Sequence, residues 1–190
     1  MADEYFEDLV VVKQNFTEKT LEKGTYEGCS FEHCIFNSTD ISTIQFLDCN
    51  FESCDLSLAI IKGTAFRDVK FKDCKMQGLH FEDCSQFLFD ARFENCNLNH
   101  STFYNLPMKN TFLKNCSCKE VDWSGADLTG ATFDQTDLYF SKFDQTNLEK
   151  ADLSTAYNFS IDPEKNKIKK AKFSIEGLAG LLGKYDLKIK

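Results

Sequence analysis

A large apolar residue recurs at every fifth position over most of this chain. One run of such positions spans residues 16–81, and a second spans residues 93–153. Two residues before most of these positions stands a small residue, as Ala126 stands before Leu128. A residue at every fifth position would be scattered around an α-helix and would alternate between the two faces of a strand. The spacing therefore argues against ordinary helices and ordinary sheets as the main structure.

A chain that turns a corner every five residues can point both repeat residues inward. Four such turns close a square coil, and successive coils stack with backbone hydrogen bonds about 4.8 Å apart. Residues 20 apart should then lie on top of one another, and the resulting ladders are apolar throughout, for example Phe31, Phe51 and Phe71. The roughly 28 repeats predict about seven coils and a rod on the order of 34 Å long. The register slips by two residues between Cys84 and Phe89.

Several segments follow one five-residue pattern. Residues 126–130 read Ala-Asp-Leu-Thr-Gly, residues 131–135 read Ala-Thr-Phe-Asp-Gln, and residues 151–154 read Ala-Asp-Leu-Ser. They resemble the A-(D/N)-L-x-x consensus of pentapeptide-repeat proteins, and earlier repeats are Cys-x-Phe or Cys-x-Leu variants. The resemblance covers residues 16–158. It implies an all-β fold, a right-handed quadrilateral β-helix.

The segments outside the repeats are expected to close the two ends of the rod, because a solenoid needs atypical ends to cover its core. Residues 1–15 are predicted to be an N-terminal cap. Residues 159–190 are predicted to contain an irregular link, a helix and a short strand. The helix should have Ser174 as its N-cap and stop at Gly183, and the alternating pattern of residues 185–190 indicates the strand.

The C-terminal segment has a second interpretation. Ile161-Asp162-Pro163 with Asn166, followed by a Leu-rich helix and a strand, resembles the dimerisation element of the quinolone-resistance (Qnr-type) pentapeptide-repeat proteins. The resemblance implies that this end caps the last coil and joins two copies into a homodimer. The residues expected to form that contact are Leu178, Leu181, Leu182, Tyr185 and Leu187. In the alternative, the helix only caps the rod.

The nine cysteines and three histidines do not form a recognisable reactive site. Eight cysteines fall at the small inward position and Cys118 falls at the large one, with no CxxC pair spaced for zinc. The histidines fall at outward positions, with no cysteine beside them on the outer surface. No nucleotide-binding, metalloprotease or hydrolase motif is present. We therefore expect no catalytic, cofactor-binding or metal-binding residues and no enzymatic activity.

Charge and hydropathy exclude two further classes. The chain has 30 acidic and 22 basic residues and a net charge of −8, whereas nucleic-acid affinity comes mainly from Lys and Arg. Direct nucleic-acid binding is not expected. No apolar stretch approaches the roughly 20 residues that span a bilayer, and the N-terminus is acidic, unlike a secretory signal. These features predict a cytoplasmic protein that does not bind membranes.

The distribution of charge suggests a function. Residues 159–190 carry +4, whereas the repeats are acidic, and their far half contains Asp122, Asp127, Asp134, Asp137 and Asp144. Qnr-type relatives are similar to B-DNA in shape and charge, bind DNA gyrase or topoisomerase IV, and shield it from quinolones. The resemblance thus implies a non-catalytic DNA mimic whose five aspartates engage a type II topoisomerase and modulate quinolone sensitivity. The alternative is a structural scaffold whose shape is recognised by an unrelated protein.

Overall fold

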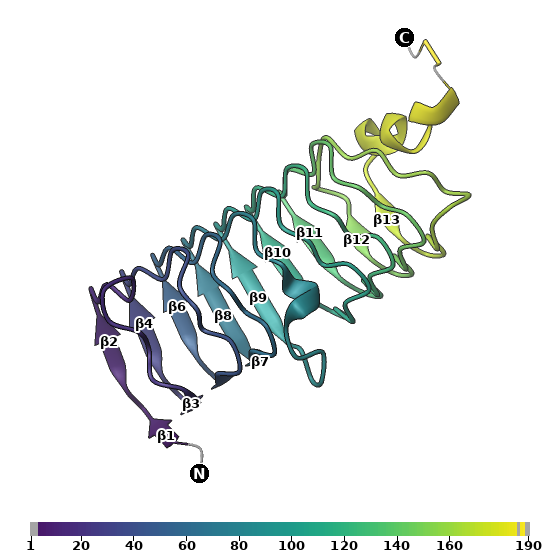
Figure 1. The fold of residues 1–190 in the computed structure, drawn as a ribbon. Coiled ribbons are helices and arrows are strands. Elements are labelled where there is room, and N and C mark those ends of the chain that lie inside the picture. Colours follow the sequence, from purple (N-terminus) through teal and green to yellow (C-terminus); the bar gives the residue numbers. More distant parts are fainter. Residues whose placement is uncertain (1–3, 186, 189–190) are drawn as a thin grey trace.

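A computed structural model describes residues 4–185 and 187–188 and shows a straight rod of about eight stacked turns (Figure 1). Each coil has four sides, in chain order the short-sheet side, the long-sheet side, a third side and a fourth side. All strand pairs are parallel. The predicted all-β quadrilateral β-helix is confirmed.

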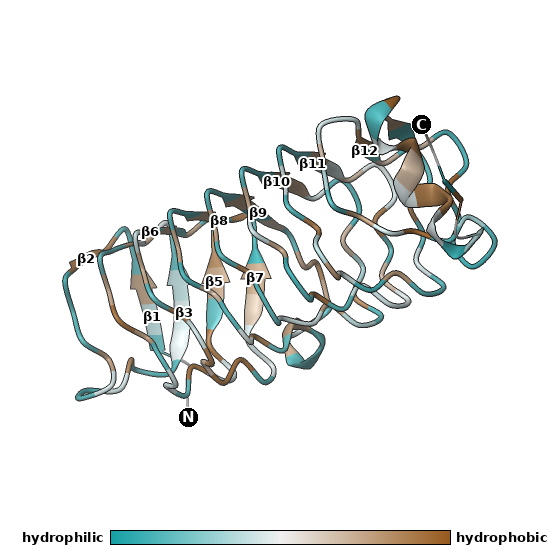
Figure 2. Cartoon of the chain, turned by 90° about the horizontal axis from the view of Figure 1, so that it is seen from above, coloured by the Kyte–Doolittle hydropathy of each residue, from teal (hydrophilic) through white to brown (hydrophobic). Residues whose placement is uncertain are grey.

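The two sheets run along the rod axis. The short sheet contains β1 (Glu4–Glu7), β3 (Gly24–Glu27), β5 (Gln45–Leu47) and β7 (Ala65–Arg67), which lie side by side in the N-terminal half (Figure 2). The long sheet contains β2 (Val10–Val12), β4 (Ser30–Glu32), β6 (Asn50–Glu52), β8 (Val69–Lys72), β9 (Ala91–Glu94), β10 (Phe112–Lys114), β11 (Thr132–Asp134), β12 (Asp152–Leu153) and β13 (Lys172–Phe173).

The large residue of each repeat forms stacked ladders in the core. The rings of Phe31 and Phe51 stack with centroids 4.8 Å apart, and the rings of Phe51 and Phe71 with centroids 5.1 Å apart. The aromatic ladder that passes through Trp123 likewise places its ring 4.5 Å from that of Phe103. Parallel stacking in exact register accounts for this arrangement, because each inward position meets the same position one coil away.

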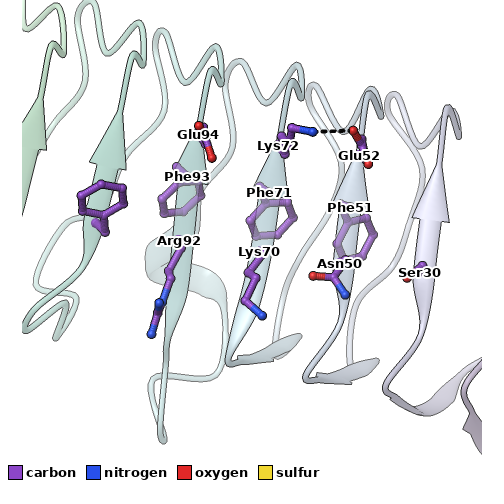
Figure 3. Close-up of a pocket in the computed structure, with 11 residues that line it drawn as sticks. Ser30, Asn50, Phe51, Glu52, Lys70, Phe71, Lys72, Arg92, Phe93 and Glu94 are labelled. Carbon is purple, nitrogen blue, oxygen red and sulfur yellow. Dashed lines mark hydrogen bonds and ion pairs between the residues drawn. The ribbon is translucent and has the colours of Figure 1, made fainter.

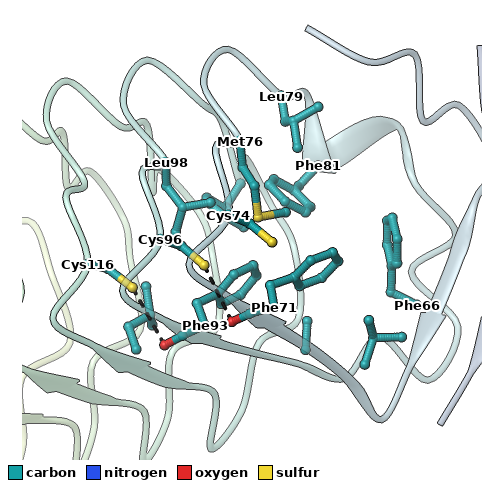
Figure 4. Packing of buried hydrophobic residues seen from close by; sticks show 14 of the residues in the cluster. Phe66, Phe71, Cys74, Met76, Leu79, Phe81, Phe93, Cys96, Leu98 and Cys116 are labelled. Carbon is teal, nitrogen blue, oxygen red and sulfur yellow. Dashed lines mark hydrogen bonds between the residues drawn. The ribbon is translucent and has the colours of Figure 1, made fainter. Parts of the chain in front are cut away.

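The small inward position holds the cysteines for a structural reason. The Cys54 thiol donates a hydrogen bond to the Phe31 carbonyl in the preceding coil, and the Thr64 hydroxyl donates the equivalent bond to Ile41. Figure 4 shows the same contact from Cys96 to the Phe71 carbonyl in the preceding coil. All nine cysteines are buried and free. Burial raises the pKa of Cys49 to about 12, which disfavours the reactive thiolate.

The register slip near Gln86 is a small projecting loop. Phe51 pairs with Phe71, 20 residues on, but Phe71 pairs with Phe93, 22 residues on. The two extra residues follow η1 (Phe81–Asp83), a 3₁₀ helix of one turn. At the loop, Phe87 and Leu88 are 67% and 63% exposed, and the Arg67 guanidinium lies 5.3 Å from the centre of the Phe87 ring.

The coils extend beyond the N-terminal boundary expected from the repeats. Strands β1 and β2 pair with β3 and β4 in the 20-residue register, so the described part of residues 1–15 forms a coil and not a separate cap. Phe6 stacks on Tyr26 with ring centroids 4.5 Å apart, and Val11 pairs with Phe31. These two side chains occupy the large inward position, although the residues around them depart from the repeat pattern.

The C-terminal end also continues the coil after a break. Asn158 stands where a large apolar residue is expected, and it is exposed with a φ of +60°. The 20-residue register resumes where Asn147 bridges to Lys167 and Asp152 pairs with Lys172. The β-helix pairing therefore reaches Phe173, beyond the expected boundary at residue 158.

The predicted C-terminal helix is present as two 3₁₀ helices, η2 (Glu176–Leu181) and η3 (Gly183–Tyr185). The Ser174 hydroxyl accepts a hydrogen bond from the Gly177 N–H, which fits its predicted capping role. The predicted strand over residues 185–190 is not seen where the structure describes that segment, because Tyr185 belongs to η3 and Leu187 and Lys188 are irregular. The rest of that predicted strand lies outside the described residues.

Candidate interaction surface

Three of the five aspartates predicted to engage a partner stabilise the coil itself. The carboxylate of Asp122 accepts a hydrogen bond from the Ser124 N–H at 2.8 Å. Asp127 and Asp137 accept the equivalent bond from the residue two positions further on, at 3.1 and 3.2 Å. This Asx turn satisfies a backbone donor beside each corner, which explains the Asp or Asn of the five-residue pattern.

The same three carboxylates are also paired with lysines from a neighbouring coil. Lys142 lies 3.3 Å from Asp122, and Lys109 and Lys119 each lie 3.4 Å from Asp127 and Asp137, respectively. Partial burial raises the pKa of Asp122. The hydrogen bonds from Ser124 and the charge of Lys142 outweigh this effect and lower the pKa below its usual value. Each of these three carboxylates therefore already has a lysine partner within the protein.

The five aspartates do not form one surface. Asp134 lies on the long-sheet side, and Asp127 lies on the side that continues the short sheet, where it bridges to Pro107 and Asn147. Asp137 lies on the third side, and Asp122 and Asp144 lie on the fourth. Asp134 accepts a hydrogen bond from Thr155, and the Asp144 carboxylate has no hydrogen bond or ion pair to any described residue. The structure thus does not bring the five predicted residues together.

A different set of acids lies in one line. Asp8, Asp48, Asp68 and Asp90 occupy the corner between the short-sheet and long-sheet sides, and we call these four residues the acidic column. Asp8, Asp48 and Asp68 each follow the last residue of a short-sheet strand, Asp90 follows the loop one coil later, and all four are exposed. None of the four carboxylates forms an ion pair with a described residue. Neighbouring coils are about 4.8 Å apart, so the column presents unpaired charge along the rod axis.

The charge of the chain is concentrated in the same half of the rod. Residues 1–90 contain 17 of the 30 acidic residues and 8 of the 22 basic residues, a net charge of −9, which leaves +1 on residues 91–190. Toward the C-terminus the charge at the same corner changes from negative to positive, because Lys150 and Lys170 occupy it. Sequence reasoning missed this because it summed charge by segment and did not pair each acid with the lysine that stands 18 to 20 residues away. Pairing each acid with residues one coil away would have located the acidic column.

The residues predicted for dimerisation divide into two groups. Leu181 packs against the core and so belongs to the cap. Leu178, Leu182 and Leu187 are 46%, 37% and 57% exposed. The Tyr185 hydroxyl donates a hydrogen bond to Glu164, and Lys184 pairs with both Asp162 and Glu164, which fastens η3 to the preceding link. The three exposed leucines are therefore not needed to cover the core.

Among residues 4–185 and 187–188, no group of three or more His, Cys, Asp or Glu side chains is arranged to hold a metal ion. In that part of the chain no helix is long and apolar enough to cross a membrane.

Comparisons with known proteins identify the repeats. A model of the pentapeptide repeat region matches residues 24–86, and a model of pentapeptide repeats matches residues 108–149. No curated protein matches the chain. The solved structure of full-length QnrB1, described as a plasmid-mediated fluoroquinolone resistance protein, is similar with a TM-score of 0.58 and 19% identity, over 97% of this chain and 100% of that one.

A trypsin-treated variant of QnrB1 is similar with a TM-score of 0.59 and 22% identity, over 100% of this chain and 92% of that one. At these identities the likeness shows a shared fold. Together with the two matched regions and the five-residue register seen in the coils, it places this chain in the pentapeptide-repeat family.

Proposed function

We propose that this protein is a non-catalytic interaction protein whose anionic N-terminal half occupies the DNA-binding surface of a type II topoisomerase, DNA gyrase or topoisomerase IV. Bound there, it would compete with DNA and modulate quinolone sensitivity. The observation that carries the proposal is the acidic column, a line of exposed and unpaired carboxylates on a straight rod. The shared fold with QnrB1, a fluoroquinolone resistance protein by its description, supports it.

The magnitude of the charge sets the extent of the mimicry. B-DNA carries one phosphate per about 3.4 Å along each strand, whereas the coils offer at most one corner carboxylate per about 4.8 Å. Gly28 interrupts the acidic column between Asp8 and Asp48. The column therefore imitates a short length of one strand and not a whole duplex. Its contribution to binding should weaken with added salt, because exposed charges are screened.

Inhibition of DNA supercoiling by gyrase tests the proposal. The wild-type protein should inhibit at micromolar concentration, and the triple variant Asp48→Asn, Asp68→Asn, Asp90→Asn should need about tenfold more protein, because it loses three unpaired charges. The matched control is Asp122→Asn, Asp127→Asn, Asp137→Asn, which removes the same number of charges. Its asparagines can still accept the Asx-turn hydrogen bonds, so the fold should remain and inhibition should change little.

Two results would contradict this proposal. One is a wild-type protein that leaves supercoiling unaffected at micromolar concentration. The other is a control triple variant that loses as much inhibition as the variant of the acidic column, since total charge and not the column would then matter.

We also propose that the C-terminal end joins two copies through Leu178 and Leu182, which are exposed beside the Leu181 that covers the core. The variant Leu178→Asp, Leu182→Asp should have the mass of a monomer in size-exclusion chromatography with light scattering, whereas the wild type should have the mass of a dimer. Leu58→Asp, Ile60→Asp changes two exposed apolar residues elsewhere on the rod and should remain dimeric. A wild type of monomer mass would refute this contact.

The scaffold alternative rests on a second surface. Tyr139 and Phe140 contact each other with ring centroids 4.2 Å apart, and Phe140 is 71% exposed with a φ of +54°. A φ in the left-handed region recurs at the corners of these coils, for example at Leu58 and Leu88. What distinguishes this corner is its exposed aromatic pair, and exposed apolar patches mark sites where partners bind. A partner recognised there would bind equally well after neutralisation of the acidic column, which separates the two functions.

A further inference from the structure

The long sheet carries a groove that the acidic column does not explain. Its volume is about 460 Å³, within the range of small-molecule sites, and it runs across β6, β8, β9 and β10. The floor is the backbone at Phe51, Phe71 and Phe93, whose rings point inward to the core. Two rows of outward side chains form its walls, one before and one after each inward phenylalanine (Figure 3).

The wall that follows the phenylalanines is neutralised within itself. Lys72 lies 2.7 Å from the Glu52 carboxylate, and Lys114 lies 2.9 Å from the Glu94 carboxylate. Acids and bases alternate along this row, as expected for stacked neighbours in a sheet. Its charges therefore need no external partner.

The opposite wall has no such compensation. Lys70 and Arg92 are direct register partners across β8 and β9, and Figure 3 shows both extending to the same side of the strands. Neither cation forms a hydrogen bond or an ion pair with any residue that the structure describes. Like charges directly opposite one another in a sheet destabilise it. An anion bound between them would remove this repulsion.

The row continues with a residue suited to an aromatic ligand. Phe112 is the register partner of Arg92 on β10, borders the same groove and is 38% exposed. On the other side of Lys70 the row continues with Asn50, which adds an uncharged donor. An anionic group between the two cations would thus lie one coil away from an exposed phenyl ring.

The acids around the cation pair restrict the size of the anion. Asp68 and Asp90 precede Lys70 and Arg92 by two residues at the neighbouring corner, and Glu52 and Glu94 stand across the groove. An extended polyanion such as nucleic acid would meet these four carboxylates. A single compact anion lying in the groove would not.

We propose that this groove binds an aromatic phosphate monoester, with the phosphate held between Lys70 and Arg92 and the ring lying against Phe112. Two adjacent cations match a dianion, and the planar guanidinium of Arg92 suits two phosphate oxygens at once. A phosphate monoester is largely dianionic above its second pKa near 6. A carboxylate on the same ring supplies only one charge and should bind less tightly.

The test is a titration of the full chain with phenyl phosphate, followed by backbone amide chemical shifts. Saturable shifts are expected in β8, β9 and β10, and Lys70→Met, Arg92→Met should weaken binding by about tenfold or more. The control Lys62→Met removes an exposed lysine on the fourth side and should bind as the wild type does. Phe112→Ala should weaken phenyl phosphate by about threefold and leave inorganic phosphate unchanged, because only the ring contact is lost.

Further arms identify the ligand. Benzoate should bind more weakly than phenyl phosphate. A phosphotyrosine peptide that binds more tightly than phenyl phosphate would place the monoester on a protein. A phosphotyrosine peptide that binds more weakly than phenyl phosphate would place it on a small molecule. Absence of saturable shifts up to about 10 mM phenyl phosphate overturns the proposal, because a Kd above this concentration is weaker than expected for a specific site with two cations and a ring contact. Unchanged affinity in the Lys70→Met, Arg92→Met variant overturns it as well, and so does equal loss of both phosphates in Phe112→Ala.

Discussion

Replacement of Phe71 by alanine should lower the free energy of unfolding by about 3–5 kcal/mol. The Phe71 ring is 1% exposed and lies between the rings of Phe51 and Phe93, with centroids 5.1 and 5.5 Å away. Figure 4 shows it among side chains of neighbouring coils. In parallel stacking the coils on either side cannot close together around the void, so the lost contacts are not recovered. Guanidinium unfolding followed by circular dichroism measures the effect.

The matched control for this prediction is Phe112→Ala on the outer surface of the same sheet. Phe112 is 38% exposed, so its removal should change stability by within about 0.5 kcal/mol. A loss below about 1 kcal/mol for Phe71→Ala would show that the ladders are not the main source of stability.

Gly180→Ala should detach the C-terminal 3₁₀ helix η2 from the last coil. A Cβ atom at Gly180 would clash with the Phe159 carbonyl oxygen and would lie 2.8 Å from two atoms of its ring. The oxygen belongs to the backbone and cannot rotate away, so η2 must move and the hydrogen bond from the Ile161 N–H to the Gly180 carbonyl is strained. Overpacking of this kind costs about 1–3 kcal/mol.

Hydrogen exchange of residues 174–185 reports this detachment directly, because the amides of η2 lose protection while those of the long sheet keep theirs. Gly183→Ala is the matched control, since its Cβ would come no closer than 3.3 Å to the Ser160 hydroxyl oxygen. Equal protection in the two variants would show that close packing on Phe159 does not hold η2.

The sequence predicts the interior of this protein in detail because every coil repeats the same rule. Each inward residue meets its equivalent one coil away, so the five-residue spacing alone predicts that Phe31, Phe51 and Phe71 stack. It also predicts that Cys54 and its equivalents are buried. The hydrogen bonds of their thiols to carbonyls of the preceding coil could not be foreseen from spacing, because they depend on side-chain geometry.

The ends and the surface were less predictable for two physical reasons. A coil needs only its large inward residues, so Phe6 and Val11 are sufficient for a coil where the rest of the repeat pattern is absent. At the surface, whether a charged side chain is paired or unpaired depends on its neighbour in the next coil. Asp122 counts as a free acid in the sequence, but in the fold its carboxylate is paired with Lys142 from the next coil.

The two-residue insertion at 84–90 changes the separation between paired residues from 20 to 22 and leaves the stacking intact on both sides of it. Phe71 and Phe93 still stack with ring centroids 5.5 Å apart. The tip of the insertion at Phe87 and Leu88 leaves the rod outward, whereas Phe89 packs on Phe66 and Phe81 with ring centroids 6.4 and 6.2 Å away. Insertions at the tip are thus free to vary in size and sequence without a change in the scaffold, and the tip is the natural place to graft a foreign peptide onto the rod.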